Sequence, residues 1–72
     1  MRMINIEELI PFMKKGWVAM DKRGVWTWFD KEPYIPKDLF IWATNSPDFK
    51  ELSSCFDIAP VEDWETSLRK VG

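Results

Sequence analysis

The sequence predicts an α+β fold, and three observations lead to that prediction. Apolar residues recur at helical spacing near both ends of the chain. Between these two ends, two short runs rich in Trp and Val flank a turn signal. A chain of 72 residues has room for a single domain (1–72) with a small core. We therefore expect an N-terminal helix, an antiparallel β-hairpin, one or two further strands and a short C-terminal helix, with the sheet covered on one face.

The N-terminal helix is predicted from its start signals and its apolar stripe. Asn5 is a favourable N-cap residue, and Glu8 follows at the spacing of a capping box. Gly16 is the expected stop. Pro11 removes an N–H group from the helical ladder, so a kink or a break is expected there. The apolar stripe consists of Ile6, Leu9, Ile10 and Met13.

The hairpin is predicted over residues 17–20 and 25–29. The connecting segment begins with Asp21 and ends with Gly24, which fits a turn closed by a glycine at positive φ. Side chains alternate between the two faces of a strand. The second strand therefore has apolar residues on both faces: Trp26 and Trp28 on one, and Val25, Thr27 and Phe29 on the other.

The second half of the chain gives weaker structural signals. Pro33 and Pro36 indicate a loop over residues 30–38. A third strand is expected over 39–43. Residues 51–58 are ambiguous, and 55–58 within them could form a short edge strand. Pro60 is suited to the first position of a C-terminal helix. The apolar stripe of that helix would be Val61, Trp64 and Leu68, with Glu65 and Arg69 as an i, i+4 pair.

Composition excludes several classes of function. The chain has no histidine, which removes imidazole bases, Ser-His-Asp triads and His-containing zinc sites. One cysteine cannot form an internal disulfide. Neither a secretory signal nor a run of about 18 apolar residues is present, so we expect a cytoplasmic protein that is not in the membrane. No cofactor and no metal is expected.

Catalysis is not expected either. Asp30 and Asp57 have apolar neighbours, but Asp at the end of a strand is most often a turn former. The sequence contains no glycine-rich phosphate loop and no nucleophile elbow. Ser53 and Ser54 precede Cys55 without an apparent general base, and Cys55 is expected to be a small buried apolar residue. We therefore predict that the protein is not an enzyme.

The main anomaly is the aromatic content of five Trp, five Phe and one Tyr. One interpretation is that a small domain fills its core with large rings. Phe12, Trp64 and one face of the hairpin would be enough for such a core. The other interpretation is that the excess forms an exposed binding patch, since Trp and Tyr are frequent at interface hot spots. The candidate binding residues are Trp17, Trp26, Trp28, Tyr34 and Trp42.

The charge pattern argues against nucleic acid as a partner. The net charge is −2, whereas nucleic-acid binders are usually basic. A basic cluster at Lys14, Lys15, Lys22 and Arg23 is explained by a helix end and a solvated turn. Mimicry of a phosphate backbone is a further alternative, and its candidate acidic residues are Asp48, Glu51, Asp57, Glu62, Asp63 and Glu65.

Three segments resemble small proteins encoded by bacteriophages and prophages: Ile-Glu-Glu-Leu at 6–9, Lys-Gly-Trp-Val-Ala at 15–19 and Val-Glu-Asp-Trp at 61–64. The two ends are also similar to the phage Thoeris anti-defence family, which sequesters a cyclic nucleotide-like signal. The Trp-Asn-Gly-Lys-type segment of that family is replaced by Asp-Lys-Arg-Gly at 21–24, so no ligand-binding residue is carried over. The resemblance implies a small accessory protein of a phage or mobile element in a bacterial cytoplasm.

These observations favour a non-enzymatic protein that binds a protein partner, or a second copy of itself, through the hairpin and the proline loop. The alternatives are a protein that sequesters a nucleotide-like small ligand between aromatic rings, and an acidic mimic of nucleic acid that acts as an inhibitor.

Overall fold

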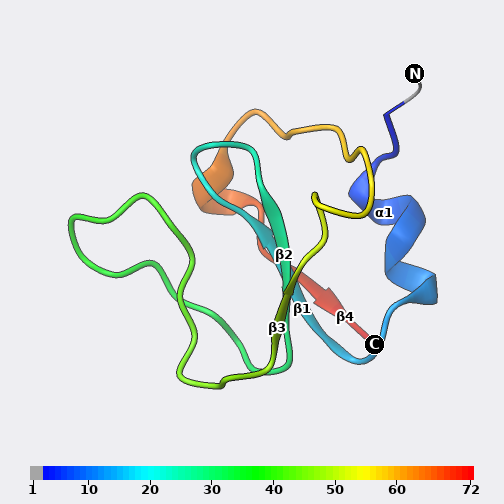
Figure 1. Cartoon of the computed structure of the whole chain (residues 1–72). Helices are drawn as coiled ribbons and strands as arrows, with labels where there is room; N and C mark the ends of the chain where they lie inside the picture. Colours follow the sequence, from blue (N-terminus) through cyan, green and yellow to red (C-terminus); the bar gives the residue numbers. More distant parts are fainter. Residues whose placement is uncertain (1–2) are drawn as a thin grey trace.

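The computed structural model describes residues 3–72 and shows an α+β domain built around one antiparallel sheet (Figure 1). The strands are β1 (Gly16–Met20), β2 (Trp26–Phe29), β3 (Phe49–Glu51) and β4 (Arg69–Val71), arranged in the order β3-β2-β1-β4. A short helix α1 (Ile6–Leu9) continues as the 3-10 helix η1 (Ile10–Phe12), and a second 3-10 turn, η2 (Trp64–Thr66), precedes β4. The predicted fold class is confirmed.

The N-terminal helix forms where it was predicted and changes character at the proline. The carboxylate of Glu8 accepts a hydrogen bond from the N–H of Asn5 at 3.0 Å, in the manner of a capping box. After Leu9 the helix tightens to 3-10 geometry, with Pro11 in its first turn. The predicted stop at Gly16 is wrong, because Met13 already has extended backbone and Gly16 is the first residue of β1.

The β1–β2 hairpin confirms the predicted turn and the predicted division of faces. The Asp21 carboxylate accepts hydrogen bonds from the N–H groups of Arg23 and Val25, and Gly24 has φ +88°. Val18 pairs with Trp28, and Met20 pairs with Trp26. These four side chains share one face of the sheet and contribute to the core, whose buried members are Ile6, Val18, Met20, Trp26, Leu52, Ile58 and Val71.

The other face of the hairpin is covered by the long β2–β3 loop. Ala19 and Phe29 are buried on this face, and residues 41–44 lie over it. Figure 1 shows this loop extending from the sheet on the side away from α1. The expectation of a sheet covered on only one face is therefore too simple, because α1 and this loop lie on its two sides.

The third strand is not the one predicted. Residues 39–43 are irregular, and only Ala43 makes a bridge, to Tyr34. Pro36 accepts a hydrogen bond from the N–H of Leu39 and Asp38 has φ +65°, so the chain turns just where the strand was expected to begin. The strand beside β2 is instead β3, whose three residues are all exposed and carry no apolar alternation.

The C-terminal segment is helical only at η2. Asp63 caps this turn by accepting a hydrogen bond from the N–H of Glu65 at 3.1 Å. The prediction that the C-terminal helix extends through Arg69 and Lys70 is wrong, since both residues lie in β4 beside β1. The Arg69 side chain pairs with Glu7 at 3.5 Å and not with Glu65. The ambiguous segment 55–58 is no strand: Ile58 makes one isolated parallel bridge to Ile4.

Two predicted core residues lie at the surface. Phe12 is 88% exposed, because the 3-10 turn after Leu9 directs it away from the sheet. Cys55 is a free, exposed thiol in the turn that follows Leu52, whose carbonyl accepts the N–H groups of Cys55 and Phe56. Trp64, by contrast, packs against the core as predicted.

Candidate functional site

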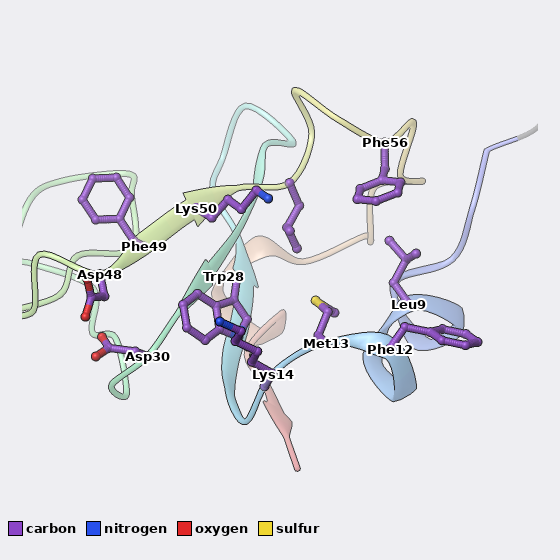
Figure 2. A pocket seen from close by; sticks show the side chains of 11 residues that line it. Leu9, Phe12, Met13, Lys14, Trp28, Asp30, Asp48, Phe49, Lys50 and Phe56 are labelled. Carbon is purple, nitrogen blue, oxygen red and sulfur yellow. Dashed lines mark hydrogen bonds between the residues drawn. The ribbon is translucent and has the colours of Figure 1, made fainter.

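A groove of about 620 Å³ lies between the N-terminal helix and β3. We refer to it as the Trp28 groove. Figure 2 shows Trp28 from β2 near its centre, Leu9 and Met13 on the helical side, and Phe56 at the same end as Leu9. The complete lining is Leu9, Phe12, Met13, Lys14, Trp28, Asp30, Asp48, Phe49, Lys50, Leu52 and Phe56.

The indole of Trp28 is held in place by the backbone around it. Its Nε1–H donates to the carbonyl of Lys14 at 3.1 Å. Beside it, Gly16 provides the necessary space: a Cβ atom there would lie 2.9 Å from the indole Nε1 and 2.4 Å from the Phe29 carbonyl oxygen. The ring is therefore a fixed, partly exposed apolar surface whose polar atom is already satisfied.

The rim of the groove is unusually apolar for an exposed surface. Phe12, Phe49 and Phe56 are 88%, 60% and 43% exposed. Phe12 and Phe56 come from η1 and from the turn after β3, whereas Phe49 lines the groove from β3 with its ring on the sheet face opposite Trp28. Single exposed apolar side chains are ordinary, whereas a contiguous group of them marks an interaction surface.

Charges are distributed unevenly along the groove. The ammonium groups of Lys14 and Lys50 belong to exposed side chains near Trp28, and the carboxylates of Asp30 and Asp48 lie together at the end away from Phe56 (Figure 2). One carboxylate oxygen of Asp30, Oδ1, is buried and has no hydrogen-bond partner within residues 3–72.

A second exposed apolar surface lies on the β2–β3 loop, which we call the loop patch. Tyr34, Leu39, Phe40 and Ile41 are 42–60% exposed. The ammonium of Lys22 lies 4.2 Å from the centroid of the Phe40 ring, a cation–π contact that ties the patch to the hairpin turn.

The five candidate binding residues do not gather at one place. Trp28 lies in the Trp28 groove, and Tyr34 belongs to the loop patch. Trp42 is partly buried, and its Nε1–H donates to the carbonyl of Trp64 at 3.2 Å. Trp17 is partly buried on β1, on the face opposite Trp28. Trp26 is fully buried and donates from Nε1 to the Ala59 carbonyl, so its ring presents no surface to a partner.

Sequence reasoning missed most of the groove. Its wall at Phe49 and Lys50 depends on β3, which carries no periodic apolar signal, and its rim at Phe12 and Phe56 depends on turns whose direction is set by tertiary contacts. The signals available in the sequence were Phe49 between the charged residues Asp48 and Lys50, and the expected break of the helix at Pro11.

The remaining reactive groups take structural roles. The Ser53 hydroxyl accepts a hydrogen bond from the N–H of Trp26, and the Ser54 hydroxyl donates to the Glu51 carbonyl. Within residues 3–72, no cluster of His, Cys, Asp or Glu has the arrangement of a metal site. In the same part of the chain, no helix is sufficiently long and apolar to cross a membrane.

Comparison with protein-family models, with curated proteins and with solved structures finds no match to this chain.

Proposed function

We propose that this protein is a non-enzymatic binding module that recognises a protein partner through the Trp28 groove. The observation that carries the proposal is the pair of exposed rings, Phe12 and Phe56, beside a fixed Trp28. Interface hot spots combine rigid aromatic surfaces with a fully enclosed anchor side chain. A groove of this size accommodates an aromatic or large aliphatic side chain of the partner.

The charged residues of the groove indicate which residues of the partner would lie beside its anchor side chain. Lys14 and Lys50 favour an acidic residue beside it, and the negative charges of Asp30 and Asp48 favour a cation such as an Arg side chain at the other end. The loop patch offers an additional, independent contact surface. By the sequence resemblance, the partner belongs to a bacterial host or its phage, and the protein acts in the cytoplasm.

The test is affinity capture from bacterial lysate with the parent chain and with a Phe12→Ala/Phe56→Ala variant. Both side chains are exposed, so the variant is expected to keep its thermal midpoint and lose the captured protein. Phe40→Ala, in the loop patch, is the matched control and should retain capture. Equal capture by the groove variant and the parent contradicts the proposal.

A second candidate function has its own supporting observation. A volume of about 620 Å³ falls in the range of small-ligand sites, and Trp28 with Lys14 and Lys50 combines a stacking surface with two cations. This arrangement fits a nucleotide-like anion, which the protein would sequester without changing it chemically.

A thermal-shift screen with mono-, di- and cyclic nucleotides separates the two candidates. A specific ligand at 100 times its dissociation constant adds about 2.7 kcal/mol to the free energy of unfolding. Lys14→Ala/Lys50→Ala should abolish such a shift, whereas Lys37→Ala, outside the groove, should not. Absence of any shift leaves the protein-binding proposal in place and removes this one.

A further inference from the structure

Strand β3 forms an edge of the sheet, and apart from the Glu51 carbonyl its outward backbone groups have no hydrogen-bond partner within residues 3–72. The N–H of Asp30 donates to the Asp48 carbonyl, and the N–H of Leu52 donates to the Trp26 carbonyl. Pairing in an antiparallel ladder alternates, so Trp28 and Lys50 form the hydrogen-bonded pair between these two. The N–H and C=O groups of Phe49 and Glu51 consequently point away from β2.

The outward edge has a specific pattern of donors and acceptors. Phe49 offers both its N–H and its C=O, and Glu51 offers its N–H, because its carbonyl already accepts the Ser54 hydroxyl at 2.9 Å. Pro47, two residues before Phe49, has a carbonyl but no N–H. An edge strand with free donors and acceptors can still pair with another strand, although its short length, Pro47 and Lys50 restrict which strand fits.

We propose that a second copy of this chain pairs with that edge, β3 against β3 antiparallel, with Phe49 directly opposite Phe49 of the second copy. The two Phe49 residues exchange their N–H and C=O hydrogen bonds. The N–H of each Glu51 then meets the Pro47 carbonyl of the other copy. In this register Pro47, which has no N–H to donate, faces the Glu51 carbonyl of the other copy. That carbonyl already accepts the Ser54 hydroxyl, so it does not need a second donor.

Side-chain charge selects this register over its neighbours. In an antiparallel pair, directly opposed residues lie on the same face of the sheet. With a two-fold axis perpendicular to the sheet, each possible register is therefore centred on one residue that lies opposite its own copy. The register centred on Phe49 places Asp48 opposite Lys50 of the other copy, twice. The register centred on Lys50 opposes two lysines, and the register centred on Glu51 opposes two glutamates.

The pairing also uses the exposed aromatic ring. Phe49 is 60% exposed and lies on the sheet face opposite Trp28, so the two Phe49 rings become cross-strand neighbours. Asp48 and Lys50 line the Trp28 groove, and the two grooves therefore meet across the symmetry axis. Because β3 is short, the interface is small, and a reversible, concentration-dependent dimer is expected.

Sedimentation equilibrium up to about 1 mM chain tests the proposal. A Cys55→Ser background is used, because the exposed thiol could otherwise form an intermolecular disulfide. Phe49→Pro removes the outward N–H without touching a bond to β2, and is expected to leave the protein monomeric with an unchanged circular-dichroism spectrum. Phe12→Ala, on the groove rim away from the edge, should leave the association unchanged.

A charge exchange tests the register and does not depend on a proline. Lys50→Asp places Asp48 opposite an aspartate in both pairs, and should weaken the dimer roughly tenfold. Asp48→Lys combined with Lys50→Asp restores opposite charges and should restore the association. Lys70→Asp, on the opposite edge strand β4, carries the same change in net charge and should have little effect.

Three results overturn the proposal: a chain that is monomeric at the highest concentration, a dimer that survives Phe49→Pro, and a double charge exchange that fails to restore what Lys50→Asp removes. The proposed capture of a partner protein is tested separately with Phe12→Ala/Phe56→Ala, so its result is distinguishable from these three outcomes.

Discussion

The hydroxyl of Ser67 accepts a hydrogen bond from the backbone N–H of Met20 at 2.8 Å, across 47 residues of sequence. Ser67 is fully buried, and its oxygen also lies 2.6 Å from the Trp64 carbonyl and 3.0 Å from the Met20 carbonyl, to one of which it donates. One side chain thus joins the end of β1 to the η2 turn. This link explains why a polar residue is enclosed in so small a core.

Replacing that hydroxyl should cost stability. In Ser67→Ala the N–H of Met20 remains buried without an acceptor, and an unsatisfied buried donor costs about 1–3 kcal/mol. Urea denaturation measures the loss as a lower midpoint with an unchanged slope. Ser54→Ala, in an exposed turn, is the control and should shift the free energy of unfolding by less than about 0.5 kcal/mol. Equal losses in both variants would count against the buried link.

Gly16 should not tolerate a side chain. A Cβ atom would lie 2.4 Å from the Phe29 carbonyl oxygen, and this oxygen belongs to the paired backbone of β2 and cannot easily withdraw. Gly16→Ala is therefore expected to destabilise the protein by about 1–3 kcal/mol. At Gly24, where the nearest atom is Pro60 Cβ at 4.0 Å, alanine meets only the strain of positive φ, and the loss should be smaller. A neutral Gly16→Ala variant would contradict the close approach of β1 and β2.

Truncation to alanine should have little effect on stability at Phe12 and a large effect at Leu52. Phe12 is 88% exposed, so Phe12→Ala is expected to change the free energy of unfolding by less than about 0.5 kcal/mol. Leu52 is 5% exposed and belongs to the core, so Leu52→Ala should cost about 2–5 kcal/mol. Chemical denaturation of both variants makes the comparison. A large loss at Phe12 would place its ring inside the protein, where the sequence alone had put it.

The exposed thiol of Cys55 should react in the native state. The Cys55 side chain lies on the surface, with its Sγ 3.9 Å from the Ser54 hydroxyl. We expect a disulfide reagent to modify one thiol per chain without denaturant, at a rate similar to that of the unfolded protein. Labelling that requires denaturant would indicate that the turn after Leu52 is covered.

Acrylamide should quench the five tryptophans unequally. Trp26 is fully buried, whereas Trp28 is only partly buried in its groove. Trp26→Phe should therefore remove the least accessible component of the emission, and Trp28→Phe a more accessible one. Stern–Volmer analysis of both variants measures the difference. Equal loss from the two variants would contradict the assignment of Trp26 to the core and Trp28 to the groove.

The sequence by itself determined the elements whose signals are local. The Glu8 capping interaction, the change of helix at Pro11 and the Asp21–Gly24 turn depend on residues within a few positions of one another. The alternation that places Trp26 and Trp28 on one face follows from strand geometry alone. These features, together with the α+β class, were predicted correctly.

Tertiary structure decided the partners of each strand and the location of the surface aromatics. Residues 39–43 are more apolar than 49–51, yet β2 pairs with the latter, because the turn at Asp38 prevents the former from running along the sheet. Arg69 to Val71 form β4 because β1 has a free edge there, against their helical signal. The aromatic excess was visible in the composition. Which rings form the core, and which surround a groove, depended on contacts between segments far apart in the chain, and no local pattern encodes these contacts.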